Sequence, residues 1–82
     1  MLTKEAYFIL ELMLDCGIYQ SMIDNGGRYT PVEKENFRKD INSRLDDLKS
    51  RNPSYDGKLV KLSNETVHDL TKTLGEIFHS IP

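Results

Sequence analysis

The stretch "AYFILELMLDCGIY", residues 6–19, decides the fold, because it carries more apolar surface than one helix face needs. At 100° per residue, only Lys4, Glu11 and Asp15 form a coherent polar stripe on a helix through this segment. Apolar side chains occupy most of the remaining circumference, roughly 280° of it. A helix of this kind needs more than one neighbour to bury it, so the question is what covers the rest.

Local signals place the first helix over residues 4–24. Thr3 is the expected N-cap, because its hydroxyl can accept a hydrogen bond from a free backbone N–H in the first turn. Gly26 and Gly27 are expected to end the helix, since glycine readily adopts the left-handed conformation found after helix C-termini.

The second helix is predicted over residues 31–51. Thr30 and Glu33 have the spacing of a capping box, and Pro31 stands at the first helical position, where its missing N–H is harmless. Pro53 disfavours helical backbone at the residue before it, which ends the helix.

The third helix is predicted over residues 64–80, with Ser63 as its N-cap. An extended linker at 52–62 joins it to the second helix and contains one short apolar stretch, "KLVKL". With no partner strand visible, the sequence predicts an all-α domain of three helices and no sheet.

The chain totals favour a single domain, residues 1–82, at a size where one core only just suffices without disulfides or metals. Cys16 has no second cysteine to pair with, and we see no secretion signal, so the cytoplasm is the expected compartment. Charged and polar residues interrupt the apolar run from Ala6 to Ile23, which argues against a membrane span.

The apolar faces of the three helices are unequal. The second helix has a narrow stripe and the third a face of ordinary width, so neither can cover the whole first helix. We therefore expect a surface for another protein, centred on the first helix. The expected contact residues are Tyr7, Phe8, Leu12, Cys16, Tyr19 and Ile23.

Two alternatives remain open for this apolar surface. The linker could fold back and cover the first helix with Tyr55, Leu59, Val60 and Leu62. A second copy of the chain could also cover it, which would make the protein a homodimer.

No residue pattern predicts an enzyme, a cofactor or a metal site. His68 and His79 lie three helical turns apart, too far to share one metal ion. Cys16 is expected to be a small buried hydrophobe with a raised pKa rather than a nucleophile. The segment "DNGGR" at 24–28 lacks the Lys-Ser/Thr of a phosphate-binding loop, so it is interpreted as a helix terminator.

Basic residues on the second helix, including Arg38 and Arg44, raise nucleic-acid binding as a rival function. Acidic residues interleave with them, as in the pairs Glu35 with Lys39 and Asp40 with Arg44, and no aromatic platform accompanies them. A solvated helix face is the favoured interpretation, which makes nucleic acid the less expected partner.

The segments "NFRKDINSRLDDLKSRN" at 36–52 and "KLSNETVHDLTKTLGEIFHSI" at 61–81 give the chain the character of small early proteins of T-even bacteriophages. Among these, its size and expected compartment resemble the cytoplasmic lysis-inhibition antiholins. The resemblance implies a regulator in the host cytoplasm that binds the cytoplasmic segment of a membrane holin and delays pore formation. It carries no functional residue over to this chain.

Overall fold

The computed structural model describes residues 2–81 as three helices: α1 (Lys4–Asp24), α2 (Pro31–Arg51) and α3 (Val67–Ser80). Single 3-10 turns lie at Gly26–Arg28 and Pro53–Tyr55, and the described residues include no strand. The all-α, three-helix prediction is confirmed. The predicted bounds of the first two helices coincide with those observed.

The predicted N-caps of α1 and α2 are present. The Thr3 hydroxyl accepts from the Ala6 backbone N–H at 3.1 Å. At α2, the Thr30 hydroxyl accepts from the Glu33 N–H at 3.1 Å, and the Glu33 carboxylate accepts from the Thr30 N–H at 3.2 Å. These bonds satisfy backbone donors that have no partner within the helix.

α1 ends at Asp24 as predicted, but the predicted role of the two glycines in ending it is wrong. Gly26 and Gly27 do not take the left-handed conformation, and Gly57 in the linker is the only described residue with positive φ. Asn25 ends the helix instead, its backbone N–H and side-chain amide both donating to the Ser21 carbonyl at 2.9 Å.

The predicted start of α3 is also wrong, by three residues. The helix begins at Val67, and 64–66 form a turn in place of a helical first turn. The Thr66 hydroxyl accepts from the Ser63 N–H at 2.8 Å and donates to the Lys61 carbonyl at 2.6 Å. Ser63 is therefore held in the turn and does not cap the helix.

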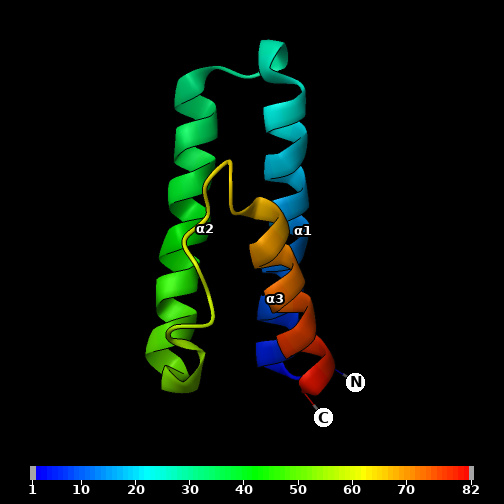
Figure 1. Ribbon diagram of the computed structural model, residues 1–82, viewed down its shortest axis with the longest axis vertical. Helices are drawn as coiled ribbons and strands as arrows, with labels where there is room; N and C mark the ends of the chain where they lie inside the picture. Colours follow the sequence, from blue (N-terminus) through cyan, green and yellow to red (C-terminus); the bar gives the residue numbers. More distant parts are fainter. Residues whose placement is uncertain (1, 82) are drawn as a thin grey trace.

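The helices pack as a hairpin of α1 and α2, with α3 lying along the N-terminal half of α1 (Figure 1). α1 contacts both other helices, but the α2 and α3 backbones do not approach each other closely. The linker, which extends over 52–66, passes between them, as the yellow segment of Figure 1 shows.

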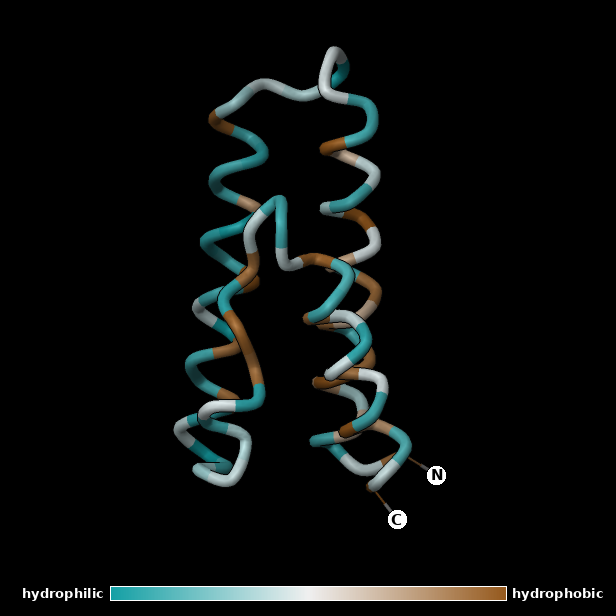
Figure 2. The backbone as a smooth tube through the Cα atoms, in the orientation of Figure 1, coloured by the Kyte–Doolittle hydropathy of each residue, from teal (hydrophilic) through white to brown (hydrophobic). Residues whose placement is uncertain are grey.

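The linker completes the core. Leu59 and Leu62 are 4% and 1% exposed and belong to the same apolar cluster as the inward residues of all three helices. Figure 2 shows this apolar stretch running between α2 and α3. Of the four linker residues proposed to cover the first helix, Leu59 and Leu62 are buried in the shared core, whereas Tyr55 is only partly buried and Val60 is 43% exposed.

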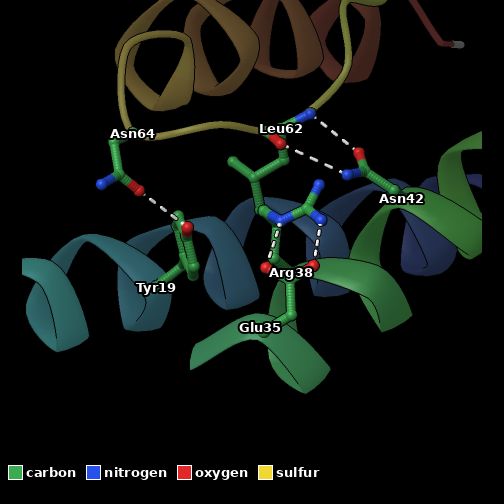
Figure 3. Close-up of polar contacts among 6 residues, drawn as sticks. All are labelled: Tyr19, Glu35, Arg38, Asn42, Leu62 and Asn64. Carbon is green, nitrogen blue, oxygen red and sulfur yellow. Dashed lines mark hydrogen bonds and ion pairs between the residues drawn. The ribbon is translucent and has the colours of Figure 1, made fainter. Parts of the chain in front are cut away.

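A buried asparagine fixes the linker against α2. The Asn42 side-chain amide donates to the Leu62 carbonyl at 3.2 Å, and its carbonyl accepts from the Leu62 N–H at 2.8 Å (Figure 3). Asn42 is 7% exposed, so these bonds replace water for both backbone groups of Leu62. The pair sets the register of the linker on the helix.

Candidate protein-binding surface

The six contact residues predicted on the first helix fall on different sides of α1. Leu12, Cys16 and Tyr19 are 0%, 0% and 4% exposed, so they form the core and their place in the predicted surface is wrong. Phe8 and Ile23 are half-buried against that core, and Tyr7 is 52% exposed. The physical reason is that α2, α3 and the linker together cover the side of α1 that carries the first three.

Two of these aromatic residues have structural partners of their own. The Tyr19 hydroxyl donates to the Asn64 side chain at 2.8 Å, which ties the end of the linker to α1 (Figure 3). The Arg51 guanidinium lies over the Phe8 ring, 4.6 Å from its centroid, and joins the C-terminus of α2 to the first turns of α1. Both rings stabilise the fold.

The side of α1 that faces away from α2 and the linker is apolar and exposed. Tyr7, Leu14 and Ile18 are 52%, 61% and 50% exposed, and Leu10 beside them is half-buried. The four share one side of the helix, at spacings of three or four residues between neighbours. Glu11 lies on the same side, between Tyr7 and Leu14 along the helix. We call these five residues, Tyr7, Leu10, Glu11, Leu14 and Ile18, the α1 outer face.

The apolar surface continues from the outer face onto the end of α3. An open hollow of about 520 Å³ lies there, between the first turn of α1 and the last turn of α3. Its walls are Leu2, Thr3, Ala6, Tyr7, Phe78, His79 and Ile81. Tyr7 belongs to both features, so the hollow and the outer face form one continuous surface.

The flank of α1 that faces α2 carries a bridging ion pair. Arg44 of α2 contacts the Asp15 carboxylate at 2.5 Å and the Asp40 carboxylate at 2.9 Å. Burial lowers the pKa of Arg44, but hydrogen bonds and charge from both aspartates outweigh it and leave the pKa raised. The pair holds α1 against α2 beside the outer face.

Glu11 differs from Asp15 in having no such partner. It is exposed, and none of the ion pairs formed among residues 2–81 includes it. On the other flank, His68, Lys72 and His79 are exposed along α3, and the same ion pairs leave them out too. The apolar surface is therefore bordered by the negative Glu11 on one side and the positive Lys72 on the other.

The basic residues of α2 are mostly engaged by acidic neighbours. Arg38 pairs with Glu35, and Arg51 pairs with Asp47 at 3.0 Å, while Arg44 bridges two aspartates as described above. Lys49 stands 4.0 Å from Asp46. The predicted pair of Asp40 with Arg44 is present, but Glu35 contacts Arg38 in place of Lys39. These contacts support the interpretation of α2 as a solvated charged face.

Cys16 is enclosed by the α1 and α3 packing. Burial raises the pKa of its thiol from the ordinary 9.0 to about 11, against a smaller opposite effect from a hydrogen bond with Thr71. The predicted role as a buried hydrophobe with a raised pKa is confirmed.

The buried thiol predicts slow chemical modification. In the folded protein at pH 8 about one Cys16 in 1,000 is thiolate, so labelling by a disulfide reagent should be at least about 100-fold slower than in urea. The neutral thiol stabilises the fold fully below pH 9, and this contribution should fall as the pH rises toward 11. Cys16→Ala is expected to remove that part of the alkaline slope. Fast labelling without urea would show that Cys16 is accessible.

Within residues 2–81, the structure contains neither a cluster of metal-ligating side chains nor a helix suited to span a membrane. No group of three or more histidine, cysteine or acidic side chains there is placed to hold a metal ion. No helix in that part of the chain has the length and apolarity needed to cross a bilayer.

Comparisons of the chain with protein-family models, with curated proteins and with solved structures found no match.

Proposed function

We propose that the protein is a non-enzymatic regulator that binds another protein through the α1 outer face and the adjoining hollow. The observation that carries this proposal is the exposure of Tyr7, Leu14 and Ile18 on a helix whose opposite side already fills the core. Exposed apolar patches that continue into a concave surface are typical of protein-interaction sites.

The energetics favour a partner that covers more than the three exposed side chains. Burying their exposed halves yields roughly 2–5 kcal/mol, whereas micromolar affinity needs about 8 kcal/mol. Association also costs translational and rotational freedom. The hollow between α1 and α3 offers the additional apolar area, through Leu2, Phe78 and Ile81.

The resemblance to the phage antiholins supplies a specific candidate for the partner. In that setting the bound protein is the cytoplasmic segment of a membrane holin, and binding withholds that segment from pore assembly. An amphipathic segment next to a membrane is of the kind that docks as a helix in a groove. This identity rests on the resemblance, and the binding of a partner rests on the exposed surface.

The double variant Leu14→Glu/Ile18→Glu tests the proposed function. It should abolish capture of the partner from the cells that make the protein, because it places two charges in the interface. Its free energy of unfolding should change by less than about 1 kcal/mol, since both side chains are exposed.

The matched control is Val32→Glu, at an exposed apolar residue of α2 that lies outside the proposed surface. It should capture the same partner as the wild type. A partner retained equally by the double variant and by the control would contradict the proposal, whereas selective loss in the double variant supports it.

A further inference from the structure

One edge of the α1 outer face, the edge nearer Asp15, carries one unpaired acidic side chain at mid-length. Glu11 lies one turn from Tyr7 and one turn from Leu14, and Ile18 follows one turn further on. The nearest basic residue of the same helix, Lys4, lies two turns away. Any partner that covers the apolar side chains must therefore also cover Glu11.

Covering a carboxylate without a counter-charge is unfavourable. Removing an ionised group from water is costly unless a partner charge and hydrogen bonds replace the lost solvation. In solution, the exposed Glu11 has no such cost. The partner must therefore bring a basic side chain to this point.

A second copy of the chain packed antiparallel on this face does not provide one. In an antiparallel two-fold pair centred between Tyr7 and Ile18, symmetry brings the two Glu11 residues within three positions along the axis, or roughly 4.5 Å. Lys4 would face Ser21 in that pair, and Asp15, already held by Arg44, would add negative charge to the same flank. Antiparallel pairing of two copies therefore gathers like charges in the apolar seam.

The opposite flank of the surface carries one lysine and two histidines, with Glu76 one turn after Lys72 on the side away from α1. On a helical wheel of α3, His68, Lys72 and His79 fall next to the edge formed by Gly75 and Phe78. That edge adjoins α1, because a Cβ on Gly75 would lie 3.5 Å from the Met13 side chain and Phe78 lines the hollow with Tyr7. A partner lying along α1 would meet these basic side chains on its other side.

From these charges we infer that the partner is an amphipathic helix with an arginine or lysine opposite Glu11 and acidic residues facing His68, Lys72 and His79. The inference rests on the proposed function and names the chemistry of its partner. The apolar seam of that helix packs on Tyr7, Leu14 and Ile18. One large apolar residue at its end fills the hollow between α1 and α3.

The shape of the surface fits one helix. The outer face from Tyr7 to Ile18 is about 17 Å long, which is three turns of a helix. Gly17 lies on its edge, and a Cβ added there would meet nothing within 4 Å. The missing side chain lets a partner helix approach the α1 backbone closely.

Three synthetic helical peptides of about 20 residues test the inference. Each carries a leucine seam with glutamates along one flank, and they differ only at one position of the other flank, which is arginine, glutamine or glutamate. Fluorescence anisotropy measures their binding to the wild type, to Glu11→Lys and to Leu14→Glu/Ile18→Glu.

The wild type should bind the arginine peptide at least about tenfold more tightly than the glutamate peptide, or about 1.4 kcal/mol. Glu11→Lys should reverse that order, which a purely structural role of Glu11 would not do. Equal binding of the three peptides to the wild type would overturn the inference and leave the proposed function standing. Equal binding to the wild type and to Leu14→Glu/Ile18→Glu would overturn both, and so would no binding of the peptides.

Sedimentation equilibrium gives an independent test on the protein alone. Glu11→Leu completes the apolar stripe, and it should associate with itself at least about tenfold more tightly than the wild type. The control Glu65→Leu changes an exposed glutamate of the linker and should leave the association state as it is. A wild type that already dimerises as tightly as Glu11→Leu would overturn the inference in favour of a second copy.

Discussion

Leu12→Ala is expected to lower the free energy of unfolding by about 3–5 kcal/mol, whereas Leu14→Ala, two residues along the same helix, changes it by less than about 1 kcal/mol. Leu12 is fully enclosed, so truncation leaves a cavity as well as losing apolar burial. Leu14 is 61% exposed and leaves no cavity. Urea denaturation followed by circular dichroism measures both values.

The pair is informative because the substitution and the helix are the same. A domain of 82 residues has a total stability of about 4–12 kcal/mol, so Leu12→Ala should leave the protein marginally folded. Equal losses in the two variants would mean that α1 is buried on both sides, and the outer face would not exist in the monomer.

Asn42→Ala is expected to cost about 2–4 kcal/mol. The substitution removes both hydrogen bonds to Leu62 and leaves its backbone N–H and carbonyl buried without partners, each at about 1–3 kcal/mol. Detachment of the linker should also expose Leu59 and Leu62, so amide hydrogen exchange should accelerate at Leu62 and its neighbours.

Two comparison variants separate hydrogen bonding from loss of side-chain volume. Asn42→Asp keeps an acceptor for the Leu62 N–H but loses the donor to its carbonyl, and should remain destabilised. Asn36→Ala, at an exposed site of α2, should be nearly neutral. An Asn42→Ala protein as stable as Asn36→Ala would show that the linker is held by its apolar residues alone.

The limits of α1 and α2 could be predicted because their start signals are local. Thr3, Thr30 and Glu33 act through hydrogen bonds within three residues, and the chain around them is sufficient to define these bonds. The start of α3 depends instead on the Thr66 hydroxyl, which donates to the Lys61 carbonyl five residues away and accepts from the Ser63 N–H. These bonds hold Ser63 in a turn and prevent it from capping the helix. A serine before an apolar helix pattern gives no sign of these bonds.

The side of α1 that faces the core could not be predicted, because apolar residues occupy most of its circumference. A helix with one narrow polar stripe has no unique inward direction. The sequence pattern therefore cannot tell whether Leu12 or Leu14 faces the core. Contacts from distant segments decide between them, including the ion pair of Arg44 with Asp15 and the contact of Arg51 with Phe8. These contacts turn Leu12 inward and Leu14 outward.

The role of Asn42 in holding the linker could not be predicted from the sequence either. Asn42 lies beside the apolar stripe of α2 that contains Ile41 and Leu45, where a polar residue ordinarily faces solvent. Its partner, the Leu62 backbone, lies 20 residues away in a segment of irregular structure. The sequence feature that could have indicated its role is a small amide side chain at the border of an apolar stripe. Such a side chain can bond the backbone of a neighbouring linker that has no strand partner.

Nuclear magnetic resonance with a soluble paramagnetic chelate tests the central claim, that α1 has one buried and one exposed apolar face. The account predicts strong relaxation of the methyl signals of Leu14 and Ile18 and weak relaxation of those of Ile9 and Leu12 in the protein alone. Equal protection of all four residues would contradict the account, because the outer face would then be covered without any partner.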